Sequence, residues 1–196
     1  MTLPESLYHL AEADNLPSIM KHGLLSTESL LELTGISKSE QTTILRNHRP
    51  DSVRLSGTVQ IRDQRPMPPA ALAVALDDGL KPSDWYALLN RHVFLWPERD
   101  RMERQLGACG GRPQILLTFD GAALFDVFGG DAFLSPINSG NARRKAARRG
   151  VQTLVPYHVW REHGWATGQR TRPPAEVLFR CKIPATAPYL IDVRKA

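Results

Sequence analysis

The chain has 196 residues, 42% of them hydrophobic and 23% charged, which is the composition of an ordinary globular protein and fits a single domain over residues 1–196. No apolar run approaches the ~20 residues that a membrane-spanning helix needs, and the first residues lack the features of an export signal, so we expect a cytoplasmic protein with no membrane partner. The two cysteines are isolated, which argues against a disulfide framework or a structural zinc site, and the formal net charge of +5 favours an anionic partner.

The first quarter of the chain is predicted to be one short strand followed by helices. Residues 7–10 form an apolar run typical of a strand, and His9 lies at its end. A helix follows, with Asp14 or Asn15 as its cap and Gly23 as the residue that ends it. Two more helices are indicated by Thr27 as a cap and by a capping box formed by Ser37 and Glu40.

In the rest of the chain, helices and strands are predicted in mixed order, and most of the predicted strands lie there. Turn residues and β-branched residues in 51–69 indicate a strand or hairpin. The elements expected after it are helices at about 70–77 and 84–90, a strand at 91–96, a helix at 97–107, a strand at 114–120, and strands within 151–157, 175–184 and 189–195. Because helices come first and strands later, the fold class is predicted to be α+β.

Three stretches resemble conserved blocks of the ADP-ribosyltransferase fold. "LYHLAEADNLPSIMKHGLL" (7–25) resembles the first block of the histidine-containing branch, which RNA 2′-phosphotransferases and poly(ADP-ribose) polymerases share with DarT-type DNA-modifying toxins. Its DNLPSI wording is most similar to DarT, although the "HG" of the first two groups is "HL" here. "PAEVLFRCKIP" (174–184) is similar to the late strand that carries the catalytic glutamate, and "HVFLW" (92–96) to the aromatic strand beside the nicotinamide.

The resemblance implies an α+β ADP-ribosyltransferase-like fold, in which a split β-sheet with flanking helices forms an NAD cleft. NAD is then a substrate, and no metal is expected. By position in the matched blocks, Glu176 would be the catalytic glutamate and His9 the residue that positions NAD. The remaining candidates are a catalytic arginine, Arg62 with Arg65 as its alternative, and the NAD-binding residues Asn15, Phe94 and Trp96.

These residue types suit the chemistry that the resemblance implies. Cleavage of the bond between nicotinamide and ribose develops positive charge on the sugar, and a fixed carboxylate stabilises that charge. The same carboxylate can take a proton from the incoming nucleophile. An arginine grips a diphosphate with two parallel hydrogen bonds, which suits Arg62 to a phosphate or to the target.

Two stretches point to single-stranded DNA or RNA as the acceptor. In 135–150, a turn rich in Ser, Asn and Gly precedes a basic cluster of Arg143, Arg144, Lys145, Arg148 and Arg149, which suits a phosphate backbone. In 157–174, aromatic residues alternate with arginines, and Trp160, Trp165 and Arg170 are expected to contact bases and phosphates. The expected setting is a toxin–antitoxin or phage-defence system, with a cognate antitoxin as a partner.

Other interpretations stay open at this point. Glu176 is also compatible with a solvent-facing carboxylate paired with Arg172 or Arg180, and the aromatic residues with plain core. At the level of function, the alternatives are an RNA 2′-phosphotransferase-like enzyme and a non-catalytic module that binds NAD or nucleic acid.

Overall fold

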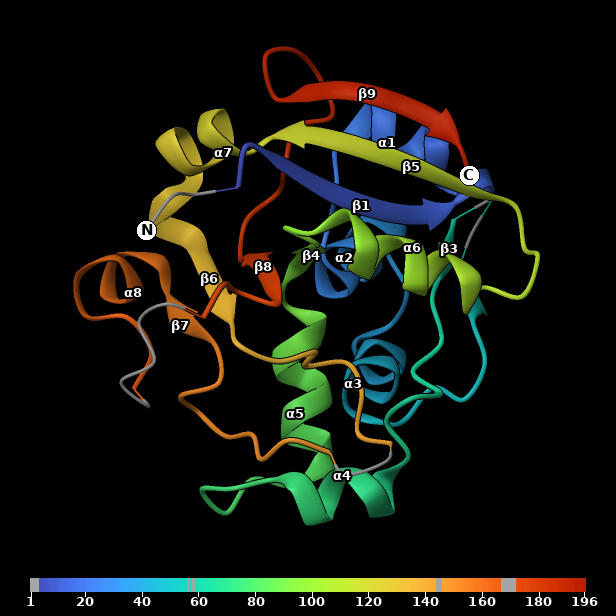
Figure 1. Cartoon of the computed structure of the whole chain (residues 1–196). Helices are drawn as coiled ribbons and strands as arrows, with labels where there is room; N and C mark the ends of the chain where they lie inside the picture. The colour runs from blue at the N-terminus through green and yellow to red at the C-terminus, as the bar shows by residue number, and fades with distance from the viewer. Residues whose placement is uncertain (1–3, 56, 58, 144–145, 167–171) are drawn as a thin grey trace.

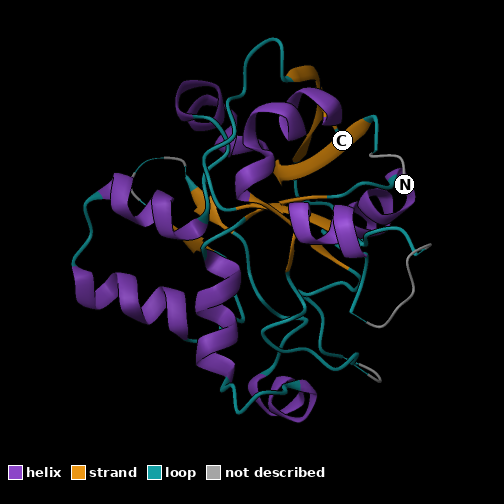
Figure 2. Cartoon of the chain, turned by 90° about the vertical axis from the view of Figure 1, so that its left-hand side faces the viewer, coloured by secondary structure: helices purple, strands orange, loops and turns teal. Residues whose placement is uncertain are grey.

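The computed structural model describes residues 4–55, 57, 59–143, 146–166 and 172–196 and has a mixed α+β architecture. Its described strands form three antiparallel sheets, and helices surround the strands (Figures 1 and 2). No helix among the described residues is long and apolar enough to cross a membrane.

The first sheet joins the N-terminal strand to the C-terminal one. Its order is β1 (Ser6–Glu12), β5 (Gln114–Asp120) and β9 (Leu190–Lys195), with each neighbouring pair antiparallel. In the central strand, Leu117 and Phe119 alternate with residues of the opposite face and are fully buried in the main core, as the two-residue period of a strand requires. This sheet lies across the top of Figure 1.

The second sheet has four short strands in the order β4 (Val93–Leu95), β8 (Glu176–Phe179), β6 (Ala132–Ser135) and β7 (Val155–Pro156). All four residues of β8 are buried, which agrees with its place between two neighbours. A separate two-stranded sheet pairs β2 (Val53–Arg54) with β3 (Gln60–Ile61).

The helices cover both sheets and add a second core. They are α1 (Leu16–His22), α2 (Thr27–Thr34), α3 (Lys38–Arg46), α4 (Pro69–Ala75), α5 (Pro82–Asn90), α6 (Arg99–Gly107), α7 (Gly121–Phe128) and α8 (Tyr157–His163), with 3-10 turns η1 (Ala13–Asn15) and η2 (Gly129–Asp131). The second core lies between α4 and α5, where Leu72, Trp85 and Tyr86 are buried. These two helices lie at the end of the molecule opposite β9 (Figure 1).

The two larger sheets meet at one point, which we call the seam. Tyr8 of β1 forms an antiparallel bridge with Trp96, which follows β4. The two residues exchange both backbone hydrogen bonds, with N···O distances of 2.9 and 2.8 Å. The seam therefore joins the strand that carries His9 to the sheet that contains Glu176.

Local sequence signals predicted part of this fold correctly. The Ser37–Glu40 capping box is present, and the strand at 114–120 has the predicted bounds. Gly23 ends α1 with φ of 81°, and a Cβ there would lie 2.5 Å from the carbonyl oxygen of Ile183, so only glycine fits this close approach.

Other expectations were wrong in detail. Asn15 precedes α1 but makes no side-chain cap, and the residue that caps α2 is Ser26 rather than Thr27. In the stretch 151–157 only Val155 and Pro156 form a strand. Helices α7 and α8 and strand β6 were not predicted.

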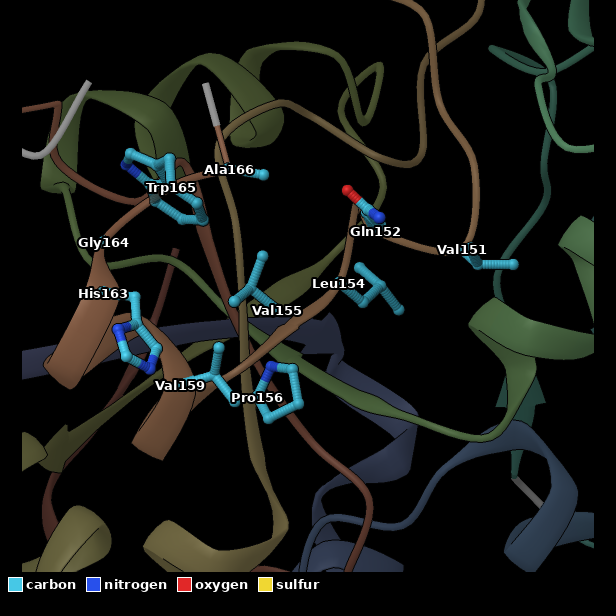
Figure 3. A pocket seen from close by; sticks show the side chains of 10 residues that line it. All are labelled: Val151, Gln152, Leu154, Val155, Pro156, Val159, His163, Gly164, Trp165 and Ala166. Carbon is cyan, nitrogen blue, oxygen red and sulfur yellow. The ribbon is translucent and has the colours of Figure 1, made fainter. Parts of the chain in front are cut away.

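A cavity of about 580 Å³ opens beside α8 (Figure 3), and neither Tyr8 nor Trp96 of the seam lines it. Aliphatic side chains from 151–159 and the indole of Trp165 form most of its wall, with Gln152 and His163 as polar groups. A more polar cavity of about 370 Å³ shares Gln152, Val155, Trp165 and Ala166 with it.

Candidate active site

His9 lies at the seam and is fixed by a backbone carbonyl. Its Nδ1 lies 2.8 Å from the carbonyl oxygen of Phe94. Desolvation and, to a smaller extent, the charge of Arg62 lower the pKa of His9 to about 4 against the opposing effect of the Phe94 hydrogen bond, so the ring is neutral at pH 7. Because a carbonyl only accepts hydrogen bonds, Nδ1 carries the hydrogen and Nε2 has a lone pair that can accept a hydrogen bond from a ligand hydroxyl.

Glu176 lies level with the seam residue Trp96. Val93 pairs with Phe179 and Leu95 with Val177, so the same antiparallel register continued by one residue brings Trp96 opposite Glu176. Trp96 itself pairs with Tyr8, the residue before His9. The segment 93–96 is thus the element that brings the first and last matched blocks together.

The carboxylate of Glu176 is buried and held by one residue. Its Oε2 accepts hydrogen bonds from the backbone N of Ser139 at 3.0 Å and from the Ser139 hydroxyl at 2.6 Å. In the described part of the chain Oε1 accepts no hydrogen bond, and it is not among the fully buried unpartnered atoms. One oxygen is therefore fixed, and the other is available to a ligand.

Burial controls the ionisation of Glu176. It raises the pKa of this carboxyl to about 7, against the opposing effects of the Ser139 hydrogen bonds and of the charges on Arg149 and Arg101. The alternative of a solvent-facing carboxylate is wrong, because the residue is only 6% exposed. Among the ion pairs of the described residues, none joins Glu176 to Arg172 or Arg180.

The two aromatic candidates lie at the seam with different surroundings. The Phe94 side chain is partly buried and packs against the core formed by α4 and α5, while its carbonyl accepts from His9. Trp96 is partly exposed and pairs with β1 through its backbone. Both remain candidates for contact with nicotinamide.

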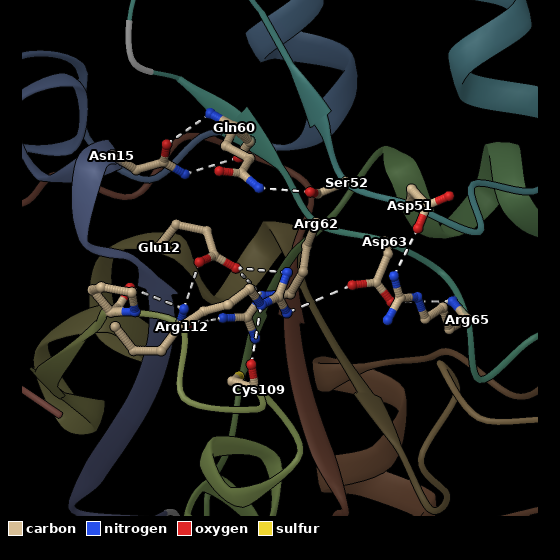
Figure 4. Close-up of polar contacts among 12 residues, drawn as sticks. Glu12, Asn15, Asp51, Ser52, Gln60, Arg62, Asp63, Arg65, Cys109 and Arg112 are labelled. Carbon is tan, nitrogen blue, oxygen red and sulfur yellow. Dashed lines mark hydrogen bonds and ion pairs between the residues drawn. The ribbon is translucent and has the colours of Figure 1, made fainter.

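Arg62 follows β3 and reaches the far end of β1 (Figure 4). Its Nη2 donates to the Oε1 of Gln114, and its Nε lies 3.6 Å from the Oε1 of Glu12. It also lies close enough to His9 to affect the pKa of that ring. Arg65 instead points to the surface, where it pairs with Asp51 at 2.7 Å, so Arg62 is the one of the two whose charge acts on His9.

Asn15 holds the backbone of the strand that precedes Arg62. Its Nδ2 donates to the carbonyl oxygen of Gln60 at 2.9 Å, and its Oδ1 accepts from the Gln60 N at 2.8 Å (Figure 4). Both polar atoms of the side chain thus help to dock β3 against the start of α1. By fixing Gln60, Asn15 fixes the position of β3, the strand that directly precedes Arg62.

We expect Asn15→Ala to lower the free energy of unfolding by about 1 to 3 kcal/mol, because two hydrogen bonds to the backbone of Gln60 are lost. Urea unfolding measures this change. Asn47→Ala is the matched control, since Asn47 is exposed and its side chain makes no hydrogen bond with the described residues. Equal stability of the two variants would contradict the docking role of Asn15.

The two tryptophans predicted to stack on a nucleic-acid base lie in the core. Trp160 is 3% exposed and Trp165 is 4% exposed, and their rings pack against each other with centroids 5.8 Å apart. The indole N–H of Trp165 donates to the carbonyl oxygen of Arg172 at 2.7 Å. Their predicted role as stacking platforms is therefore corrected to packing, although Trp165 also lines the cavity of Figure 3. Arg170 lies outside the described residues.

The basic cluster is only partly available to an anionic partner. Arg143 is exposed, whereas Arg144 and Lys145 lie outside the described residues. Arg148 pairs with Asp77 and donates to the carbonyl oxygen of Val74. Arg149 is buried at 1% exposure, so it does not belong to a solvated basic face.

Comparison with known proteins gives a family for the chain. The profile described as "Family of unknown function (DUF7002)" matches residues 5–190, which is nearly the whole chain. The chain belongs to the DUF7002 family. A search of curated proteins finds no significant match.

The region that matches DUF7002 contains the whole seam, from His9 to Glu176. Sequence reasoning missed the two residues that support Glu176 there, Ser139 and Arg149. The turn that contains Ser139 belongs to the stretch 135–150, which the sequence predicts to suit a phosphate backbone. In the fold, the backbone N–H of Ser139 instead donates to the chain's own carboxylate, that of Glu176.

Proposed function

We propose that this DUF7002 protein is an NAD-dependent ADP-ribosyltransferase with an ADP-ribosyltransferase-like split sheet. The observation that carries the proposal is the seam. The segment 93–96 connects the two strands that carry His9 and Glu176. The Phe94 carbonyl accepts a hydrogen bond from His9, and Trp96 lies opposite Glu176 in the continued register of β4 and β8. His9 and Glu176 are 167 positions apart in the chain. The resemblance assigns NAD positioning to His9 and catalysis to Glu176, and this link between their two strands supports the proposal.

The surroundings of Glu176 support a role in glycosidic cleavage. When the bond between C1′ of the ribose and the nicotinamide nitrogen breaks, its electron pair leaves with nicotinamide and positive charge develops on the sugar. An ionised Glu176, fixed through Oε2, presents Oε1 to that charge. The acceptor then forms a bond to C1′, and its proton passes to the carboxylate.

The pKa of Glu176 near 7 suits both parts of this role. A carboxyl whose pKa lies close to the working pH can be ionised during cleavage and still accept a proton afterwards. The neutral His9 complements it, since Nε2 can accept a hydrogen bond from a ribose hydroxyl and orient the sugar.

We expect His9→Ala to weaken NAD binding by about 1 to 3 kcal/mol, or roughly 5- to 150-fold, because a ligand hydroxyl loses its acceptor. Calorimetry of NAD binding measures the change. His158→Ala, an exposed histidine on α8, is the matched control and should bind NAD like the parent. Unchanged affinity in His9→Ala would return His9 to a purely structural role.

A nucleic acid remains the proposed acceptor, in a toxin–antitoxin or phage-defence setting with a cognate antitoxin. The net charge of +5 and the exposed side chains of Arg143, Arg161 and Arg172 support an anionic partner. Because Trp160 and Trp165 are buried, they do not offer a surface for a base to stack on. The proposal of a nucleic-acid acceptor therefore rests on positive charge.

The test is to incubate the protein with NAD labelled in the adenine ring, together with separate pools of single-stranded DNA, RNA and protein. We expect label in a nucleic-acid pool and release of free nicotinamide. Label found only in the protein pool would show that the acceptor is a protein, and the proposed NAD cleavage would stand. No release of nicotinamide in any pool would contradict the proposed function.

A further inference from the structure

Arg149 is a buried cation that binds backbone carbonyls. Its Nη1 donates to the carbonyl oxygen of Ser139 at 2.9 Å, its Nη2 to that of Asn141 at 2.8 Å and its Nε to that of Ala147 at 3.1 Å. No carboxylate lies within 4.0 Å of its guanidinium nitrogens among the described residues. The guanidinium is thus satisfied by dipoles, and its positive charge is not cancelled by an ion pair.

The carbonyl of Ser139 is held from two sides. The indole N–H of Trp85 donates to the same oxygen at 3.3 Å, and the Arg149 Cζ lies 6.0 Å from the centroid of that indole. On its other side, Ser139 binds Glu176 through both its backbone N and its hydroxyl. One residue therefore connects the buried cation to the candidate catalytic carboxylate.

Two charged side chains act on Glu176 from the elements packed around it. Arg149 comes from the segment before Gly150, and Arg101 comes from α6. The Arg101 side chain is 33% exposed and pairs with Glu98 at 2.7 Å, so solvent and a carboxylate weaken its effect. Arg149 is 1% exposed, and its charge acts through protein.

We propose that Arg149 is a positioning residue that fixes the Ser139 turn against Glu176 and supplies a buried positive charge beside its carboxylate. Its meaning for catalysis rests on the proposed function, while its effect on the ionisation of Glu176 does not. The inference also explains why a basic run in the sequence places one of its arginines in the core.

The experiment measures the folded-state ionisation of Glu176 without any substrate. The free energy of unfolding is determined in urea from pH 4 to pH 9 for the parent and for Glu176→Gln, and the difference between the two curves reports the midpoint for Glu176 alone. The same pair is measured with Arg149→Gln. We expect this change to raise the midpoint by about one pH unit or more, because a nearby positive charge is lost.

Two variants separate charge from packing. Arg149→Lys keeps the charge and should return the midpoint toward that of the parent. Arg148→Gln is the matched control, because Arg148 is exposed, pairs with Asp77 and should leave the midpoint unchanged. A midpoint for Glu176 in Arg149→Gln that lies within about 0.3 pH units of the parent value would overturn the proposal, since the loss of a nearby buried charge changes a carboxyl pKa by more than this.

Should Arg149→Gln fail to fold, Arg149→Lys still tests the positioning half. An ammonium cannot reproduce the planar set of three carbonyl bonds, so exchange of the Ser139 amide hydrogen should accelerate at least tenfold, while amides of β5 keep their rates. Unchanged exchange at Ser139 would overturn the proposal. If the parent releases no nicotinamide from NAD, the proposed function fails, and both of these measurements still decide the role of Arg149.

Discussion

Glu176→Gln is expected to reduce the release of nicotinamide from NAD by about 100- to 1000-fold, the usual cost of removing one electrostatic group that acts on the transition state. The amide keeps an oxygen for the two hydrogen bonds from Ser139 but carries no charge to face the developing positive charge of the sugar. Affinity for NAD should change little. A fluorescence or chromatographic assay of nicotinamide at pH 8 measures the effect.

The matched control is Glu32→Gln, which changes the same group on the exposed side of α2 and should leave turnover unchanged. The rate of the parent should also rise with pH through about 7, since Glu176 must ionise. Equal turnover by Glu176→Gln and the parent would show that another residue carries the chemistry.

The same substitution is expected to stabilise the fold at high pH relative to the parent. In the folded protein Glu176 stays protonated up to about pH 7, whereas in the unfolded chain it ionises near 4.5. Between these values the unfolded chain has released a proton that the folded protein keeps, so this residue makes the fold less stable as the pH rises. Between pH 4 and pH 8, the free energy of unfolding of Glu176→Gln should therefore rise relative to that of the parent by about 3 kcal/mol.

Urea unfolding at several pH values measures this shift, and the parent must be compared with the variant. His9 has the opposite dependence: its folded pKa of about 4 lies below the usual 6.5, so its contribution to stability is lost as the pH falls through that range. This effect cancels in the difference between parent and variant. Parallel stability curves would mean that Glu176 ionises normally in the fold.

Local patterns predicted the elements that local chemistry decides. The Ser37–Glu40 capping box depends on neighbouring residues alone and is present. Gly23 ends α1 as predicted, although its close approach to the carbonyl of Ile183 is a long-range contact that the sequence does not report. Asn15 was expected to act locally as a cap, but its amide reaches Gln60, 45 residues away. No periodicity in the sequence reports such a contact.

The site was predictable only in part for the same reason. The matched blocks named His9 and Glu176, yet the role of Ser139 depends on a turn that folds back onto β8. Trp160 and Trp165 are interleaved with arginines in a way that favours a binding loop, whereas Trp160 of α8 and Trp165, which follows the end of α8, both pack into the core. Arg149 is one basic residue in a basic run, and only the fold shows that it alone is buried among the described members.

The central claim is that the seam holds NAD, and a titration of labelled Glu176→Gln with NAD, followed by backbone amide NMR, tests it most directly. We predict that the amide shifts concentrate in 8–12 and 93–97 and at Ser139, the residues that surround the seam. Shifts confined to 151–166, around the cavity of Figure 3, or no binding up to about 1 mM NAD, would contradict the account.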